Sequence, residues 1–173
     1  MTDASSFRHD PETTGDERAT LTGFLDYQRG TLEWKCAGLT PEQLARRATP
    51  PSTLSLLGIV RHLADVERSW FRRRVAGEPV PPIFFTETEP DLDFDGAVAD
   101  PEVVATAFSA WRREAARARE ITAAVKLGDT FVHPGTGETL SVRWVLTHMI
   151  EEYARHNGHA DLLREAIDGQ TGE

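Results

Sequence analysis

The chain alternates between segments with a helical period of apolar residues and segments rich in proline, glycine and acidic residues. From residue 16 to 38, apolar side chains recur at steps of three and four, which predicts an amphipathic helix. A capping box and a proline predict a short helix that begins at Thr40 and ends before Pro50. A strong helix is predicted over 52–77. Its apolar stripe consists of Leu56, Ile59, Val60, Leu63, Val66 and Trp70.

The second half of the chain predicts two further helices. Asp100 is a capping residue followed by proline, and it begins a helix that runs to about Val125. Residues 126–140 predict a turn or a small hairpin. Ser141 caps a final helix that runs to about Ile167. Four substantial helices without a convincing sheet predict an all-α fold, a four-helix bundle.

The second and third predicted helices are separated by a long proline-rich and acidic segment, residues 78–100. We interpret it as a long surface loop whose acidic side chains keep the protein soluble. A connection of this length permits a crossover, so the helix order need not be plain up-and-down. Residues 1–15 are polar and are interpreted as a flexible N-terminal arm. Residues 16–169 are predicted to form a single bundle domain.

Length and charge narrow the class of protein. A chain of 173 residues fits one domain. It carries 19 Lys and Arg against 28 Asp and Glu, and the net charge of −9 disfavours nucleic acid and anionic membranes as partners. We find no apolar run long enough to span a membrane and no apolar leader segment, so we expect a cytoplasmic protein. The lone Cys36 excludes an internal disulfide and is interpreted as a packing residue.

The last predicted helix carries the informative pattern. At 100° per residue, a glutamate and a histidine fall within an otherwise apolar stripe, and a buried carboxylate is costly unless it is paired or bound to a metal. Glu152 and His156 are four residues apart, so they lie on one face and can converge on one ion. His62, at the edge of the stripe of the second helix, is the third candidate ligand. The stripe consists of Val142, Val145, Met149, Glu152, His156, Ala160 and Leu163.

Three protein ligands with open positions are typical of a catalytic divalent-metal site rather than a closed structural one. The pattern alone leaves two simpler interpretations open. Glu152 can pair with Arg61 or Arg155, and His62 can be a hydrogen-bonded core residue.

Side chains around this stripe are candidates for further roles. His148 and His159 lie together on one flank and are predicted to act in catalysis, by moving protons or touching the substrate. Trp70 and Trp144 are interpreted as core anchors rather than as a ligand platform.

Two segments resemble a known family. The segment from His62 to Phe71 and the segment from Glu152 to Asp161 are similar to the DinB/YfiT-like superfamily, and more narrowly to its branch of mycothiol-dependent enzymes and uncharacterised relatives (DUF664). The resemblance extends from about residue 17 to 168. It implies a four-helix bundle, often a homodimer, with a divalent metal held by His62, Glu152 and His156. Many members have histidine where this chain has Glu152, and the glutamate form resembles the mycothiol-linked branch.

The resemblance implies an enzyme that activates a low-molecular-weight thiol for S-transfer to, or isomerisation of, a small electrophile. An ion held by two neutral histidines and one carboxylate has a net charge of +1, so it favours the thiolate form of a bound thiol. Zinc is the first expectation for the metal, with nickel or iron as alternatives. A metal-dependent hydrolase and a non-catalytic, stress-related metal-binding bundle stay open as alternative functions.

Overall fold

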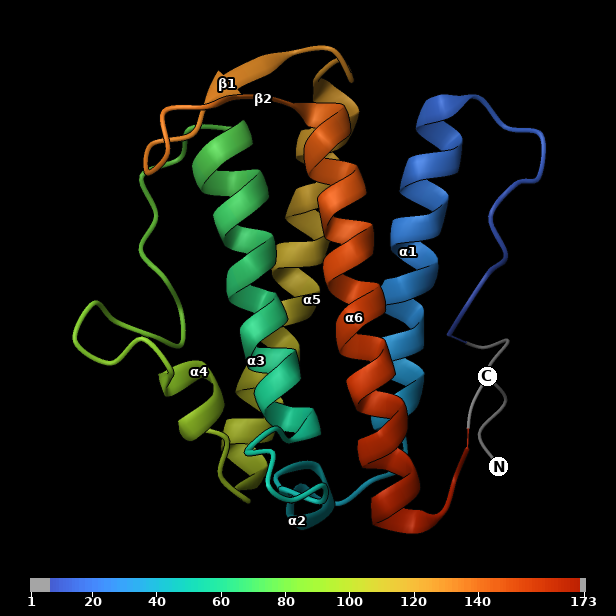
Figure 1. Cartoon of the computed structure of the whole chain (residues 1–173), viewed down its shortest axis with the longest axis vertical. Helices are drawn as coiled ribbons and strands as arrows, with labels where there is room; N and C mark the ends of the chain where they lie inside the picture. The colour runs from blue at the N-terminus through green and yellow to red at the C-terminus, as the bar shows by residue number, and fades with distance from the viewer. Residues whose placement is uncertain (1–6, 172–173) are drawn as a thin grey trace.

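A computed structural model describes residues 7–171 of the chain and confirms the all-α four-helix bundle (Figure 1). The long helices are α1 (Glu17–Cys36), α3 (Leu56–Glu67) with its π-helical continuation η2 (Arg68–Val75), α5 (Pro101–Ala124) and α6 (Val142–Asp168). The small elements are α2 (Pro41–Leu44), α4 (Leu92–Asp95) and the antiparallel pair β1 (Thr130–Val132) and β2 (Thr139–Ser141). The predicted hairpin before the last helix is therefore present.

The order of the helices requires the long connection in the middle of the chain. In Figure 1, α1 and α6 run in one direction while α3 and α5 run in the other, so α3 and α5 are parallel. The chain must return along the whole length of the bundle between them, which the segment 76–100 accomplishes. Within the bundle, α1 packs mainly against α6 and α3 mainly against α5. The crossover that this long segment permits is thus present, and it allows the parallel helices α3 and α5 to be neighbours.

The helix boundaries follow from local capping. Asp16, Asp100 and Ser141 each accept a hydrogen bond from a backbone N–H in the first turn of the helix that follows. The predicted start of the second long helix is wrong by a few residues. Its cap is Ser55, whose hydroxyl accepts from the Gly58 N–H, whereas the Ser52 hydroxyl accepts from the nearby Leu54 N–H in the preceding turn.

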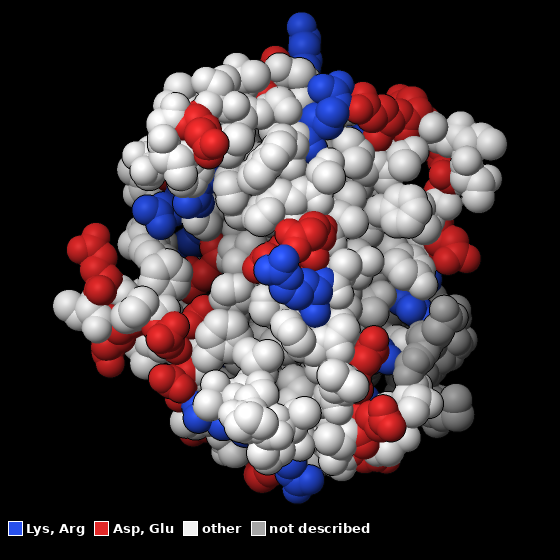
Figure 2. Space-filling view, viewed as in Figure 1, with Lys and Arg blue, Asp and Glu red and all other residues white. Residues whose placement is uncertain are grey.

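The segment between η2 and α5 is not a featureless loop. Its acidic side chains gather at the left edge of Figure 2, over the connection that Figure 1 shows there. The segment nevertheless contains α4, which the sequence pattern did not predict. Arg61 of α3 donates hydrogen bonds to the carbonyl oxygens of Leu92 and Asp93 and so fastens α4 to the bundle. Gly96 leaves room for this contact, because a Cβ there would lie 2.5 Å from the Arg61 guanidinium.

The core is built from the predicted apolar stripes. All the apolar members of the α6 stripe are buried, and Cys36 is buried as predicted. The interpretation of Trp144 as a core anchor is wrong: its side chain is 44% exposed and stacks on His148, with ring centroids 5.1 Å apart. None of the described helices has both the length and the apolarity that a membrane crossing requires.

The N-terminal segment lies along α1 where it is described. Arg8 sits over the rings of Tyr27 and Trp34, and the Phe7 carbonyl approaches Gly30 so closely that a Cβ would lie 2.1 Å from it. Residues 1–6 of the predicted arm lie outside the described residues.

Candidate metal centre

The three side chains predicted as ligands meet between α3 and α6. One carboxylate oxygen, Oε1 of Glu152, lies 3.3 Å from Nε2 of His62 and 3.4 Å from Nε2 of His156. The three candidate ligand atoms all lie within 4.8 Å of one another, and among residues 7–171 no other trio of His, Cys, Asp or Glu side chains is placed to hold an ion in this way. The side chains come from helices that lie side by side in Figure 1.

Neither arginine that the sequence left as a partner for Glu152 reaches it. Arg61 points to the backbone of α4, and Arg155 pairs with Glu151 one turn away on the exposed face of α6. Among the described residues, the side-chain partners of the Glu152 carboxylate are therefore the imidazoles of His62 and His156. Imidazole is a common metal-binding group. Both ring nitrogens of His62 face carboxylates, so the residue is hydrogen-bonded and is at the same time placed to bind an ion together with Glu152 and His156.

The hydrogen bonds in the site favour an ionised Glu152 beside a protonated His62. Hydrogen bonds from His156 and His62 hold the pKa of Glu152 well below its usual range, although burial opposes this. Burial lowers the pKa of His62, but the hydrogen bonds to Asp93 and Glu152 outweigh it and raise that pKa to about 9. In the protein without metal, the His62 ring thus carries a proton on each nitrogen.

The donor set fits a divalent ion. Bonds of about 2.0–2.1 Å arranged as a tetrahedron place neighbouring ligand atoms about 3.3 Å apart, and the two Glu152 separations match this value. An ion would take the place of the proton between Nε2 of His62 and Glu152, and it would bind the carboxylate and both Nε2 atoms. Nδ1 of His156 is buried and has no hydrogen-bond partner within residues 7–171. Two nitrogens and one oxygen suit zinc and its neighbours among the transition metals.

Asp93 contacts the candidate site, and the sequence analysis did not identify it. Its Oδ2 lies 2.8 Å from Nδ1 of His62 and accepts the proton there, which leaves Nε2 as the nitrogen that faces Glu152. The sequence predicts that the acidic side chains of residues 78–100 face solvent, but the side chain of Asp93 is buried. The signal that could have identified it is the pair of apolar neighbours, Leu92 and Phe94, which predicts a packed turn rather than a solvated loop. The Phe94 ring stacks on His62 with centroids 4.8 Å apart.

The two other histidines predicted to act in catalysis lie next to the site without joining it. The ring of His159 meets His156 edge-on, with centroids 5.3 Å apart. His148 lies in an aromatic cluster in which Trp70 and Trp144 both contact its ring. His133 of the hairpin also contacts Trp70.

A cavity of about 280 Å³ adjoins the centre. Its wall includes the ligand His62, the neighbouring Asp93 and residues of η2, among them Trp70 and Arg74. A small molecule in this cavity would lie next to His62.

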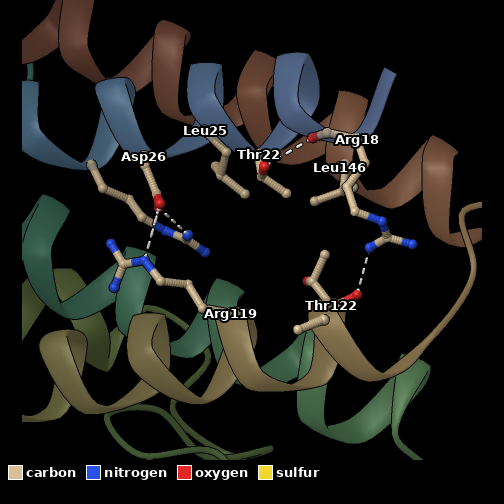
Figure 3. A pocket seen from close by; sticks show the side chains of 9 residues that line it. Arg18, Thr22, Leu25, Asp26, Arg119, Thr122 and Leu146 are labelled. Atoms are coloured by element: carbon tan, nitrogen blue, oxygen red, sulfur yellow. Dashed lines mark hydrogen bonds and ion pairs between the residues drawn. The ribbon is translucent and has the colours of Figure 1, made fainter. Parts of the chain in front are cut away.

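A second cavity of about 280 Å³ lies between α1 and α5, away from the histidines (Figure 3). Its arginines are already occupied. Arg119 and Arg29 both pair with Asp26, and Arg18 donates to the carbonyl oxygens of Thr122 and Val125 at the end of α5. We interpret it as a packing feature of the bundle.

Comparisons with known proteins agree with this architecture. A family profile described as mycothiol-S-transferase matches residues 20–169. Among solved structures, a conserved protein from Enterococcus faecalis is similar, with a TM-score of 0.62 and 15% identity over 91% of this chain and 100% of the other. At that identity the likeness shows the fold alone. No curated protein matches the chain.

Proposed function

The chain belongs to the mycothiol S-transferase family, and from this premise we propose that it is a metal-dependent enzyme that transfers a low-molecular-weight thiol to a small electrophile. The observation that carries the proposal is that His62, Glu152 and His156 each direct one candidate ligand atom to the same place, so that the three atoms lie within 4.8 Å of one another. The thiol is inferred from the family, and the metal is inferred from the two histidines and the glutamate that could bind it.

Each residue of the site has a definite task in this proposal. His62, Glu152 and His156 hold the ion, and Asp93 keeps the proton on Nδ1 of His62 so that Nε2 is free to bind. A bound divalent ion lowers the pKa of a coordinated thiol, so that the nucleophilic thiolate forms at neutral pH. The cavity beside His62 receives the electrophile. His148 and His159 flank the trio, and we propose that they contact the substrates and move protons.

Finer features belong to the same proposal. We expect zinc, ahead of nickel or iron, because two imidazoles and one carboxylate suit it and the two separations from Glu152 match tetrahedral bonds. We also expect a homodimer, as the sequence resemblance implies, and a location in the cytoplasm, as predicted from the sequence pattern. Light scattering of the purified protein measures the first of these two, and fractionation of the source cells measures the second.

Metal analysis and a transfer assay test the proposal together. Protein purified without chelator should contain close to one metal ion per chain, and it should transfer mycothiol to monobromobimane. In that reaction a sulfur–carbon bond forms, the carbon–bromine bond breaks, bromide leaves with the bonding electrons and the thiol proton goes to solvent. A chelator should abolish transfer, and restored metal should return it.

A pair of histidine variants separates the site from the rest of the protein. His156→Ala should lose both the metal and the transfer, whereas His9→Ala, an exposed histidine far from α6 in the sequence, should keep both. Transfer that survives chelation would contradict the proposal, as would full metal occupancy in His156→Ala. Added thiol distinguishes a hydrolase that uses the same ion, because thiol would inhibit hydrolysis and drive transfer.

A further inference from the structure

Two carboxylates and one arginine line the cavity beside the candidate metal centre. Both carboxylates are held by hydrogen bonds from N–H groups of the protein, whereas the arginine has no carboxylate partner in the described part of the chain. Asp65 accepts hydrogen bonds from the Ile83 and Phe84 N–H groups at 2.6 and 2.8 Å. Asp93 is bound to His62. Both carboxylates are therefore engaged in holding the protein together and are not free to receive a ligand.

Arg74 is different. Its guanidinium lies over the ring of Trp70, 4.6 Å from the centroid, and donates to the Ser69 hydroxyl. Within residues 7–171 it forms no ion pair, and its Nε is buried without a hydrogen-bond partner. Burial, followed by the neighbouring charge of Arg73, lowers the pKa of Arg74, which is the signature of a cation without compensation.

The neighbouring arginines show how unusual this is. Arg72, two residues earlier, pairs with Glu78 and with Glu114. Arg73 is exposed and is hydrated by bulk water. A half-buried guanidinium that lacks both a carboxylate and full hydration is costly, and it becomes favourable when an anion binds.

The π-helical form of η2 sets where this charge lies. Hydrogen bonds in a π-helix join residues five apart, so Arg74 stands over Ser69 and its side chain turns back toward the metal end of the cavity. Ser69 follows His62 by seven residues, which is about 10 Å along the helix axis. A small organic molecule can span that distance, with one end at the metal centre and the other at the guanidinium.

We propose that Arg74 binds the carboxylate of the electrophile, and that the second substrate of this enzyme is therefore a small organic acid whose reactive carbon lies at the opposite end from its carboxylate. That the end opposite the carboxylate is the one that reacts with the thiol rests on the proposed function. The binding of the acid itself rests only on Arg74 and the cavity. Trp70, which carries the guanidinium, forms the wall along which the molecule lies.

A binding experiment tests the anion site without turnover. Calorimetry would measure 4-nitrobenzoate against its neutral isostere 4-nitrobenzamide, in metal-free and in metal-loaded protein. We expect the acid to bind about ten-fold more tightly than the amide, because a charge-assisted hydrogen bond is worth about that factor. Arg74→Leu should remove the preference and Arg74→Lys should keep part of it. Arg73→Leu removes the same charge from an exposed neighbour and should leave the preference intact.

A kinetic experiment tests the substrate class. The thiol would be offered 4-chloro-3-nitrobenzoate or 4-chloro-3-nitrobenzamide. In each reaction a sulfur–carbon bond forms, chloride leaves with its electron pair and the thiol proton goes to solvent. The wild type should favour the acid in kcat/KM, and Arg74→Leu should lose that preference.

The outcomes separate the two proposals. Equal binding of acid and amide by the wild type would overturn the assignment of Arg74, even if transfer to bimane proceeds. Arg74-dependent binding of the acid without any thiol transfer would leave the anion site standing and overturn the transferase. A preference that survives Arg74→Leu but is lost in Arg73→Leu would move the site to the exposed neighbour and overturn the inference.

Discussion

Asp93 and His62 form the pair on which the candidate ligand set depends. The carboxylate holds the Nδ1 proton of the ring at 2.8 Å and so presents Nε2 to the ion. Asp93→Asn should therefore weaken metal binding by about 10- to 100-fold, the usual cost of losing such a carboxylate. Competition with a chromophoric chelator measures the affinity. Asp95→Asn is the matched control in the same short helix, because Asp95 is exposed and pairs with Arg47. Equal affinities in the two variants would rule out this role.

Cys36 gives a pH-dependent prediction away from the metal centre. Burial raises the pKa of its thiol from 9.0 to about 12. A group whose pKa is raised by folding contributes stability that is complete below the unfolded value and is lost as the pH rises toward the folded value. Between pH 8 and about 10.5 the wild type should lose about 2 kcal/mol more than Cys36→Ala does. Urea unfolding at the two pH values measures the difference. Parallel losses in the two proteins would show that the thiol is not protected.

At the scale of single residues, the sequence predicted the three candidate ligands that the structure brings together, and it missed the residue that supports His62. Glu152 and His156 stand out because they interrupt an apolar stripe on one helix, a pattern that needs no knowledge of the fold. Asp93 does not stand out, because its importance depends on a contact with His62, 31 residues away, that only the folded chain creates. The same holds for Arg74, which looks like one of three cations at a helix end.

The start of α3 shows how element boundaries are decided. Ser52 and Ser55 are both capping residues by type, but only the Ser55 hydroxyl accepts from the N–H three residues ahead, at Gly58. Ser55→Ala should therefore cost about 1 kcal/mol of the free energy of unfolding. Ser52→Ala, at an exposed turn, should change it by no more than about 0.5 kcal/mol. Chemical denaturation compares the two. A larger loss for Ser52→Ala would return the boundary to the predicted position.

Two elements were beyond local prediction for a physical reason. The four-residue α4 is too short to be stable by itself, and it depends on Arg61 and on the space at Gly96. The π-helical geometry of η2 likewise has no signature in the period of apolar residues. The capping box at Thr40 and the prolines at helix starts act locally, and for that reason the sequence predicted those boundaries correctly.

The whole bundle is joined by one buried polar network. Arg29 of α1 makes two hydrogen bonds to Glu67 at the end of α3, at 2.7 and 2.8 Å. Tyr153 of α6 donates to the same carboxylate, and Trp111 of α5 donates to the Tyr153 hydroxyl. Each of the four long helices thus contributes one member, and all four side chains are buried. Because each member satisfies another, the network fixes the relative placement of the helices.

Loss of the Arg29 cation should strongly destabilise the whole bundle. Arg29→Met leaves Glu67 buried without compensation and should cost about 3–5 kcal/mol in the free energy of unfolding. Arg112→Met breaks the exposed pair with Glu33 and should cost no more than about 1 kcal/mol. Urea titration of the metal-free proteins measures both. Similar costs would mean that the network does not hold the bundle together.

The division of the ligands between α3 and α6 has a consequence for biosynthesis. A nascent chain that has emerged from the ribosome only as far as the hairpin exposes His62, while Glu152 and His156 have not yet emerged. No pair of partners for an ion exists until α6 has left the ribosome and found its place beside α3. If the trio holds a metal, the ion can therefore bind all three ligands only after α6 has packed against α3, so it stabilises a bundle that has already formed and does not start its folding.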